Sequence, residues 1–131
     1  MTAAPLKNLN ILVVDDEEAS AISVAFVLRH GGHAVDTAGN GNEALTRLKE
    51  KALHYHILIT DHAMPEVSGL QLMMQLRATG FRGKTVVLSA FLTRDLRESY
   101  QALGADCLIS KPFDLADLRK AVENLGAAVD Y

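Results

Sequence analysis

The chain has a single cysteine, little excess charge of either sign and no long apolar run, and each of these features excludes a class of protein. Cys107 cannot form a disulfide within the chain, and beside Leu108 and Ile109 we expect it to be a small buried residue rather than a reactive thiol. The net charge of −3 argues against a general nucleic-acid binder, which usually carries a clustered basic face. No basic and apolar leader is visible, and no apolar run approaches the roughly 18 residues of a membrane span. We therefore expect a cytoplasmic protein that binds neither nucleic acid directly nor a membrane.

Low-complexity segments and interdomain linkers are also missing from the sequence. With 131 residues, of which 49% are hydrophobic, the default is one domain with ample apolar material for a core. We expect a single domain over residues 1–131, with its core over roughly residues 9–125. The short polar stretch after Met1 favours a natural N-terminus, and the C-terminal end gives no comparable indication.

What the sequence does contain is a regular alternation of strand-length apolar runs and segments of helical period. The predicted strands cover residues 10–14, a short stretch around Ala34 and Val35 within 33–38, and residues 55–60, 85–89 and 107–109. The predicted helices cover residues 17–30, 43–51, 69–78, 94–103 and 115–125, with Asn42, Thr93 and Asp114 as candidate N-caps. This order predicts an α/β fold, a doubly wound (βα)5 arrangement with a five-stranded parallel sheet.

Polar residues follow four of the five predicted strands. They are Asp15 and Asp16, Asp61, Ser89, and Lys111 with its following proline. Each has an ordinary explanation by itself, since acids often cap the next helix, a serine can bond within a strand end, and lysines are usually solvated. In an open α/β sheet, however, ligands bind beyond the carboxyl ends of the strands, and all of these residues are expected at that one edge.

The chemistry of this group indicates a magnesium site next to a reactive carboxylate. Adjacent carboxylates repel one another, and one should protonate unless a cation intervenes. Ligands that are all oxygen suit Mg²⁺ better than zinc or copper, and the five histidines show no metal-ligand spacing. A remaining carboxylate could attack phosphorus and form an acyl phosphate. The metal and Lys111 would neutralise the phosphoryl oxygens, and the Ser89 hydroxyl would bind one of them.

Four motifs in this order resemble the receiver domain of two-component response regulators. They are ILVVDDE, LITDHAMPEVSG, VVLSA and GADCLISKPF, and the resemblance extends over roughly residues 9–125. It implies a flavodoxin-like sheet with strand order 2-1-3-4-5. It also implies a signalling switch that catalyses only its own phosphorylation and dephosphorylation, with a sensor histidine kinase or a histidine phosphotransfer protein as phosphoryl donor.

The resemblance implies a role for each residue at the expected site. Asp61 matches the phosphorylated aspartate. Asp16 matches a direct Mg²⁺ ligand, Asp15 acts mainly through bound water, and the backbone carbonyl of Ala63 completes the protein's share of the site. The metal ligands implied are therefore Asp15, Asp16, Asp61 and Ala63.

The remaining motif residues are implied to transmit the signal. Ser89 would move to meet the phosphoryl group, and Lys111 would pair with it. The Lys111–Pro112 bond matches a cis peptide that aims the lysine into the site. A downstream protein target would bind the face made by residues 94–103, 107–109 and 115–125. The two helices of that face could also form the interface of a homodimer.

The sequence departs from the family pattern at three positions. Leu108 stands where the fifth strand usually carries a switch aromatic, so we expect phosphorylation to move the loop after Ser89 without an aromatic flip. Ala63 and Phe91 stand where neighbours of the site usually help to orient or admit the hydrolytic water. Because neither side chain can hydrogen-bond water, we expect slow loss of the phosphoryl group.

Three other functions fit parts of the same pattern. A constitutive interaction module could use the same fold, although the full set of acids, serine and lysine argues against it. An aspartyl phosphohydrolase typically needs a second acid two residues after the nucleophile, and Asp61-His62-Ala63 lacks one. A flavin binder would need a Ser/Thr/Gly-rich phosphate loop after the first strand, which is missing. His62 lies beside Asp61 and could touch the site, but a surface or packing role is favoured.

Overall fold

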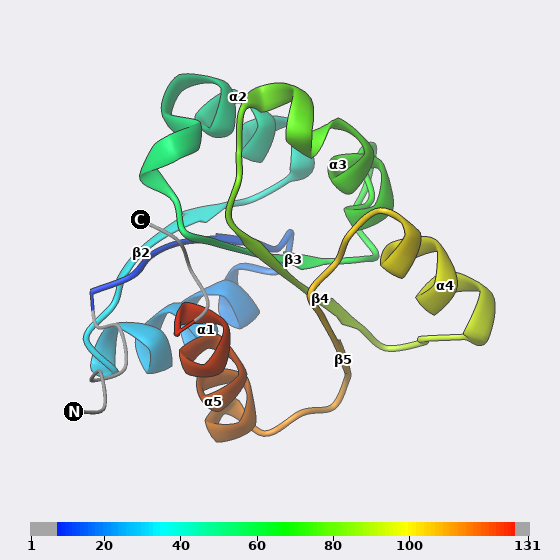
Figure 1. Cartoon of the computed structure of the whole chain (residues 1–131). Helices are drawn as coiled ribbons and strands as arrows, with labels where there is room; N and C mark the ends of the chain where they lie inside the picture. Colours follow the sequence, from blue (N-terminus) through cyan, green and yellow to red (C-terminus); the bar gives the residue numbers. More distant parts are fainter. Residues whose placement is uncertain (1–7, 128–131) are drawn as a thin grey trace.

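The computed structural model describes residues 8–127 and contains, within them, five strands that alternate with five α-helices (Figure 1). The strands are β1 (Asn10–Val14), β2 (Ala34–Ala38), β3 (Ile57–Asp61), β4 (Lys84–Ser89) and β5 (Cys107–Ser110). The helices are α1 (Glu18–His30), α2 (Gly41–Lys51), α3 (Gly69–Leu76), α4 (Arg94–Ala102) and α5 (Leu115–Gly126). Two short 3₁₀ helices, η1 (Ala52–His54) and η2 (Arg77–Thr79), follow α2 and α3. No helix in the described part of the chain is long and apolar enough to cross a membrane.

All neighbouring strands pair in parallel, in the order β2-β1-β3-β4-β5. Figure 1 shows α2, α3 and α4 on one face of the sheet and α1 and α5 on the other. The predicted fold class, a doubly wound five-stranded parallel sheet of the flavodoxin-like type with order 2-1-3-4-5, is confirmed. Parallel pairing places the carboxyl ends of all five strands at one edge, and this edge carries the polar motif residues.

The core lies in two clusters, one on each face of the sheet. In β1, Leu12 and Val14 belong to the cluster under α2, α3 and α4, whereas Ile11 and Val13 belong to the cluster under α1 and α5. Every residue of β3 is buried. A central parallel strand is covered on both faces, and this explains why the sequence shows continuous apolar runs instead of an alternating pattern.

The start of α2 differs from the sequence prediction. Asn42 was the expected N-cap, but the cap is Asn40, which is extended and whose side chain accepts a 2.8 Å hydrogen bond from the Glu43 amide. Asn42 lies exposed inside the helix. Gly41, the first residue of the helix, lies against Val67, where an added Cβ would be 2.6 Å from Val67 Cγ1. The predicted caps Thr93 and Asp114 are confirmed, since each side chain accepts a hydrogen bond from an amide in the first turn of its helix.

Cys107 is only partly buried, which corrects the expectation of a buried residue. The reason is its place in β5, an edge strand that pairs only with β4 in the described sheet. Burial and the charge of Asp106 raise the pKa of the Cys107 thiol, which disfavours the nucleophilic thiolate form.

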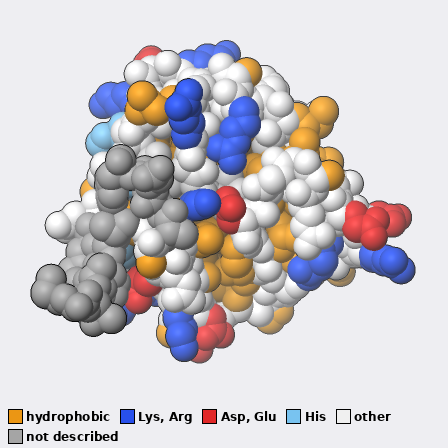
Figure 2. Space-filling model, viewed as in Figure 1, with side chains coloured by type: hydrophobic (Ala, Val, Ile, Leu, Met, Phe, Trp, Pro, Cys, Tyr) orange, Lys and Arg blue, Asp and Glu red, His pale blue; other side chains and the backbone are white. Residues whose placement is uncertain are grey.

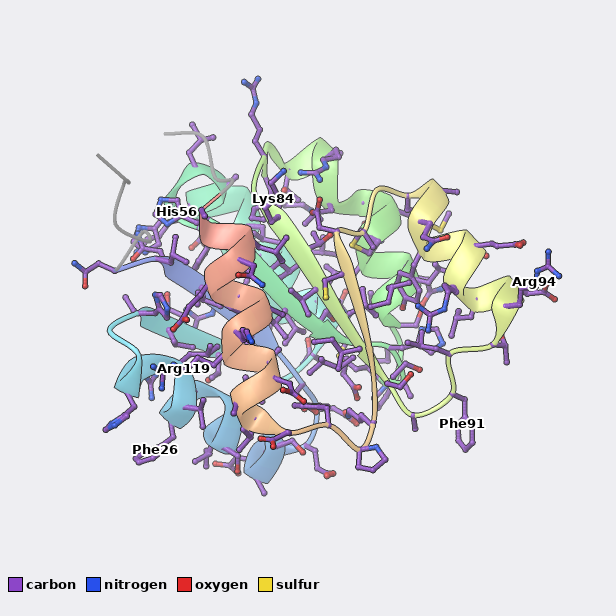
Figure 3. All side chains as sticks on the ribbon, turned by 60° about the horizontal axis from the view of Figure 1, so that its bottom comes forward. Phe26, His56, Lys84, Phe91, Arg94 and Arg119 are labelled. Atoms are coloured by element: carbon purple, nitrogen blue, oxygen red, sulfur yellow. The ribbon has the colours of Figure 1, made fainter. Side chains whose placement is uncertain are left out.

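Separate Lys/Arg and Asp/Glu side chains are spread over the face of the molecule seen in Figure 2, with apolar side chains exposed between them. The large hydrophobic residues that are most exposed in the described chain are Ile22, Phe26, Leu53, Met74 and Phe91. Phe91 and Phe26 lie on different elements, the loop before α4 and helix α1 (Figure 3).

Candidate functional site

The polar motif residues meet at the carboxyl edge of the sheet. Asp15 and Asp16 directly follow β1, Asp61 is the last residue of β3, Ser89 is the last residue of β4, and Lys111 directly follows β5. Asp15, Asp61 and Ser89 are buried, although their side chains are polar. Such burial needs compensation by hydrogen bonds or opposite charge. Ala63, the fourth predicted metal-site residue, lies in the exposed loop that leaves this edge after Asp61.

Three carboxylates form an acidic cluster that could hold a metal ion. Asp15, Asp16 and Asp61 each offer an oxygen, and these oxygens lie within 4.8 Å of one another. The amide of Glu17 donates a 2.9 Å hydrogen bond to Asp15 Oδ1 and so fixes that side chain. Burial raises the pKa of Asp15, and the charges of Asp61 and Asp16 add to this against the opposing effects of Glu17 and Lys111. A bound cation would relieve this repulsion, and an all-oxygen ligand set fits a hard cation.

Lys111 supplies positive charge to the same cluster. Its Nζ lies 2.8 Å from Asp61 Oδ1, and the Lys111–Pro112 peptide bond is cis, as the resemblance predicts. Burial lowers the pKa of Lys111, but the hydrogen bond and charge of Asp61, with the charges of Asp15 and Glu17, outweigh it. The net result is a raised pKa. The ammonium is therefore a fixed cation at neutral pH.

Ser89 is held at the junction between β4 and the loop that leads to α4. Its hydroxyl oxygen accepts a 3.3 Å hydrogen bond from the Phe91 amide, and its carbonyl accepts one of 2.8 Å from the Lys111 amide. Ala90 and Phe91 are exposed, and Phe91 is 81% exposed. The serine hydroxyl thus faces its own loop, and a small rotation or loop shift would free it for another acceptor.

Two further residues belong to this neighbourhood, and sequence reasoning missed their contact. His62 was expected to have a surface or packing role, and Tyr100 was not singled out. In the structure, a 2.5 Å hydrogen bond joins His62 Nδ1 and the Tyr100 hydroxyl. Tyr100 is fully buried, and burial, with the charge of Asp61, raises the pKa of its hydroxyl well above the ordinary value. The sequence held one indication of its burial, since Tyr100 is a lone aromatic residue in the mostly charged and polar segment RDLRESYQA.

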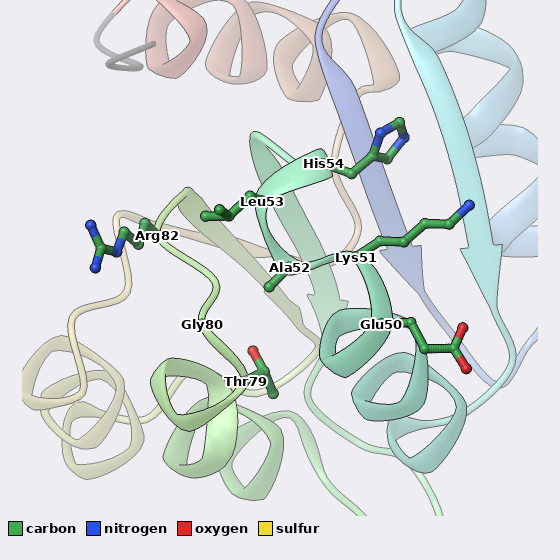
Figure 4. A pocket seen from close by; sticks show the side chains of 8 residues that line it. All are labelled: Glu50, Lys51, Ala52, Leu53, His54, Thr79, Gly80 and Arg82. Atoms are coloured by element: carbon green, nitrogen blue, oxygen red, sulfur yellow. The ribbon is translucent and has the colours of Figure 1, made fainter.

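A hollow at the opposite edge of the sheet shows no comparable convergence of side chains. It lies before the amino ends of β3 and β4, and its lining includes Lys51, Leu53, His54 and Arg82. Figure 4 shows Lys51 and Arg82 pointing in opposite directions. The carboxyl edge is therefore the candidate functional site.

Comparison with known proteins agrees with this placement. The family model described as the response regulator receiver domain matches residues 11–123. The chain is 31% identical over 117 residues to the transcriptional regulatory protein PmrA of Pectobacterium parmentieri, covering 89% of this chain and 52% of that protein. It is 36% identical over 124 residues to the response regulator Rre1 of Synechocystis, covering 89% of this chain and 51% of that protein. The chain thus spans about half the length of these curated relatives.

Solved structures show the same fold. The receiver domain of the Francisella response regulator 1452 superposes with a TM-score of 0.85 at 26% identity, covering 92% of this chain and 98% of that one. A chain of the CheX-CheY-BeF3-Mg+2 complex from Borrelia burgdorferi gives a TM-score of 0.85 at 24% identity, covering 91% of this chain and 90% of that chain. The chain belongs to the receiver-domain family of two-component response regulators, in which phosphorylation of an aspartate switches signalling.

Proposed function

We propose that the chain is a single receiver domain, over residues 1–131, in which Asp61 accepts a phosphoryl group in a Mg²⁺-dependent reaction. One observation carries this assignment to Asp61. Its carboxylate alone lies both within the three-acid cluster and against the ammonium of Lys111, among the residues that the structure describes. A carboxylate placed between a metal site and a fixed cation can act as a nucleophile towards phosphorus, because both neighbours neutralise the incoming phosphoryl oxygens.

The proposed metal ligands are Asp15, Asp16, Asp61 and the backbone carbonyl of Ala63. These donors are all oxygens, which is the ligand type that Mg²⁺ takes, and Mg²⁺ usually keeps several waters beside one or two carboxylates. When bound, the ion would supply positive charge to the phosphoryl oxygens.

The proposed reaction is a transfer between two side chains. A carboxylate oxygen of Asp61 bonds to the phosphorus of a phosphohistidine as the phosphorus–nitrogen bond breaks, and the imidazole leaves with the electron pair of that bond. Lys111 then pairs with a phosphoryl oxygen in place of its present contact with Asp61. The Ser89 hydroxyl turns from the Phe91 amide to donate to another phosphoryl oxygen, and the exposed loop after it follows.

The proposed partners follow from this chemistry. The donor is a sensor histidine kinase or a histidine phosphotransfer protein in the cytoplasm, and the chain catalyses only its own phosphorylation and dephosphorylation. A downstream protein, or a second copy of the chain, would bind the face formed by α4, β5 and α5. This face lies beside the loop that follows Ser89, which supports its use as the output surface.

The test is labelling with a small phosphodonor. Incubation with acetyl phosphate and Mg²⁺ should add about 80 Da to the intact mass, and peptide analysis should place the adduct on Asp61. Asp61→Asn and removal of Mg²⁺ with a chelator should both abolish labelling, whereas Asp117→Asn, an exposed acid on α5, should not. An adduct elsewhere would refute the assignment, and no adduct at all would favour a constitutive interaction module.

A further inference from the structure

Helix α4 is attached to the rest of the domain mainly by one side chain. Among Arg94–Ala102, all of which the structure describes, only Tyr100 is buried, and it is 0% exposed. Leu96 is partly buried, and every other residue of the helix is exposed. Figure 3 shows Arg94, at the start of this helix, reaching away from the domain. The position of α4 therefore depends strongly on how Tyr100 is held.

The hydroxyl of Tyr100 is held by the residue next to the proposed phosphoacceptor. It shares a 2.5 Å hydrogen bond with His62 Nδ1, and the two rings meet edge to face with their centroids 5.5 Å apart. The His62 amide donates a 2.9 Å hydrogen bond to the Leu88 carbonyl, so the backbone that carries the imidazole is fastened to β4. Tyr100 is thereby tied to the carboxyl ends of the central strands and not to a mobile surface group.

The close fit around Gly69 shows that this contact is built into the packing. A Cβ at Gly69 would lie 2.7 Å from the Tyr100 hydroxyl oxygen and 2.5 Å from the Asp61 carbonyl oxygen. The Gly69 amide also donates a 2.9 Å hydrogen bond to the His62 carbonyl. The hydroxyl thus occupies space that exists only because the first residue of α3 has no side chain, immediately beside the end of β3.

The two ends of α4 are held very differently. At the C-terminal end, Tyr100 lies in the core cluster on this face of the sheet, and Leu103 and Ala105 pack against that cluster. At the N-terminal end, the helix is joined to Ser89 through residues 90–93, of which Ala90, Phe91 and Thr93 are exposed. One end of the helix is therefore fixed to the core, and the other follows a solvent-exposed loop.

We infer that the His62–Tyr100 hydrogen bond is a pivot for α4. The inference rests on the proposed function: when the loop after Ser89 moves on phosphorylation, the Arg94 end of the helix moves with it and the Tyr100 end stays fixed to β3. His62 and Tyr100 are positioning residues, since they act on the helix and not on the phosphoryl group. The pivot confines the change to the loop and the first turns of α4, and it keeps the change away from β5.

The test compares hydrogen exchange with and without beryllofluoride and Mg²⁺, which together mimic the phosphorylated state. In the wild type, protection should change over residues 90–97 and stay constant over residues 100–108. Tyr100→Phe removes only the hydroxyl, so beryllofluoride affinity should stay within about twofold. In this variant the change in hydrogen exchange on beryllofluoride binding should extend through residues 100–108. Exchange rates there should change by about fivefold, because one buried hydrogen bond is lost.

Four further variants separate a pivot from a general loss of stability. Tyr55→Phe removes another tyrosine hydroxyl, which donates a 2.6 Å hydrogen bond to Asp36 far from α4, and it should keep the wild-type pattern. His62→Ala should reproduce Tyr100→Phe, and His62→Asn, whose amide oxygen can accept the hydroxyl hydrogen bond, should restore the wild-type pattern. The double variant His62→Ala/Tyr100→Phe should show no larger effect than either single change.

The outcomes distinguish this inference from the function on which it rests. The pivot is supported if Tyr100→Phe binds beryllofluoride and the change in hydrogen exchange then reaches residues 100–108. The pivot is overturned if Tyr100→Phe binds beryllofluoride with the wild-type pattern of hydrogen exchange. It is also overturned if the effects of the two single changes add in the double variant. Either result leaves the proposed function standing. Failure of the wild type to bind beryllofluoride overturns both.

Discussion

The ammonium of Lys111 lies 2.8 Å from Asp61 Oδ1, and this contact joins the ends of two strands that do not pair with each other. The Asp61 side chain is 10% exposed and that of Lys111 is 30% exposed, so solvent screens the pair only in part. On the other side of Asp61 lie the carboxylates of Asp15 and Asp16. Lys111 therefore compensates a cluster of negative charge that would otherwise oppose folding.

Replacing Lys111 by Met should weaken both folding and phosphorylation. Without the Lys111 ammonium, the buried Asp61 carboxylate faces two other acids and no cation. In the absence of Mg²⁺ the free energy of unfolding at pH 7 should therefore fall by about 1–2 kcal/mol. Labelling by acetyl phosphate should slow by about tenfold or more. Urea denaturation and mass spectrometry measure the two effects, and Mg²⁺ should restore part of the stability. Lys120→Met, at an exposed site on α5, is the control, and a wild-type labelling rate in Lys111→Met would contradict the proposed role.

The N-cap of α2 can be tested with two asparagines that are close in the sequence. Asn40→Ala removes the side-chain oxygen that accepts the hydrogen bond from the Glu43 amide, so the free energy of unfolding should fall by about 1 kcal/mol. Asn42→Ala, at an exposed position inside the helix, should change it by about 0.5 kcal/mol or less. Urea denaturation of both variants decides between the two caps. Equal losses, or a larger loss at Asn42, would contradict the assignment.

Residue patterns predicted most of the fold, and they failed where a distant contact decides. Asn42 was expected to cap a helix over residues 43–51, whereas Asn40 caps it and Gly41, its first residue, lies against the distant Val67. Similarly, Cys107 was expected to be buried, whereas in the edge strand β5 it is only partly buried. Local sequence reports the spacing of apolar residues, but it does not show which neighbour each one will meet.

The same distinction explains how much of the site was predictable. Asp61 and Lys111 could be placed together because parallel strands bring their carboxyl ends to one edge, whatever the details of packing. The contact of His62 with Tyr100 could not be placed in this way. It depends on how α4 lies over α3 and on the space left by Gly69, and neither follows from periodicity.

Gly69→Ala should destabilise the domain. The added methyl group would lie 2.5 Å from the Asp61 carbonyl oxygen and 2.7 Å from the Tyr100 hydroxyl oxygen, so the backbone or the ring must shift. Overpacking of this kind should lower the free energy of unfolding by about 1–3 kcal/mol. Thermal or urea unfolding measures the effect. Gly39→Ala is the matched control, because its Cβ would meet only Glu43 Oε2, at an ordinary 3.6 Å, and similar losses in both variants would contradict the packing argument.

His33 should make stability depend on pH. It is buried, its Nδ1 accepts a 3.3 Å hydrogen bond from the Leu9 amide, and its Nε2 has no hydrogen-bond partner within the described residues. Burial lowers the pKa of His33 from its ordinary 6.5; among the charges that face it, Glu123 raises the pKa and Arg119 lowers it further. Below pH 6.5 the unfolded chain therefore binds a proton that the folded chain resists.

The stability contribution of neutral His33 is thus complete above its unfolded pKa and is lost as the pH falls towards its lower folded pKa. The slope can reach about 1.4 kcal/mol per pH unit for one proton. Urea denaturation at a series of pH values between neutral and mildly acidic should show the loss, and His33→Asn, whose amide oxygen can still accept from Leu9, should reduce it. His30→Asn, at an exposed site, should leave the pH dependence as it is. An unchanged slope in His33→Asn would exclude His33 as the cause.

Phosphorylated Asp61 should lose its phosphoryl group slowly. The two positions expected to orient or admit the hydrolytic water, residues 63 and 91, carry apolar side chains. Ala63 and Phe91 are both exposed, and neither has a hydrogen-bonding group that could orient a water molecule towards phosphorus. Ala63→Gln adds an amide at this place and should shorten the lifetime by about tenfold. The measurement is loss of the mass adduct after the phosphodonor is removed. Ala78→Gln, exposed at the opposite edge of the sheet, is the control. A wild-type lifetime of seconds would mean that water is positioned without help from residues 63 and 91, and the backbone around Asp61 would then have to orient it.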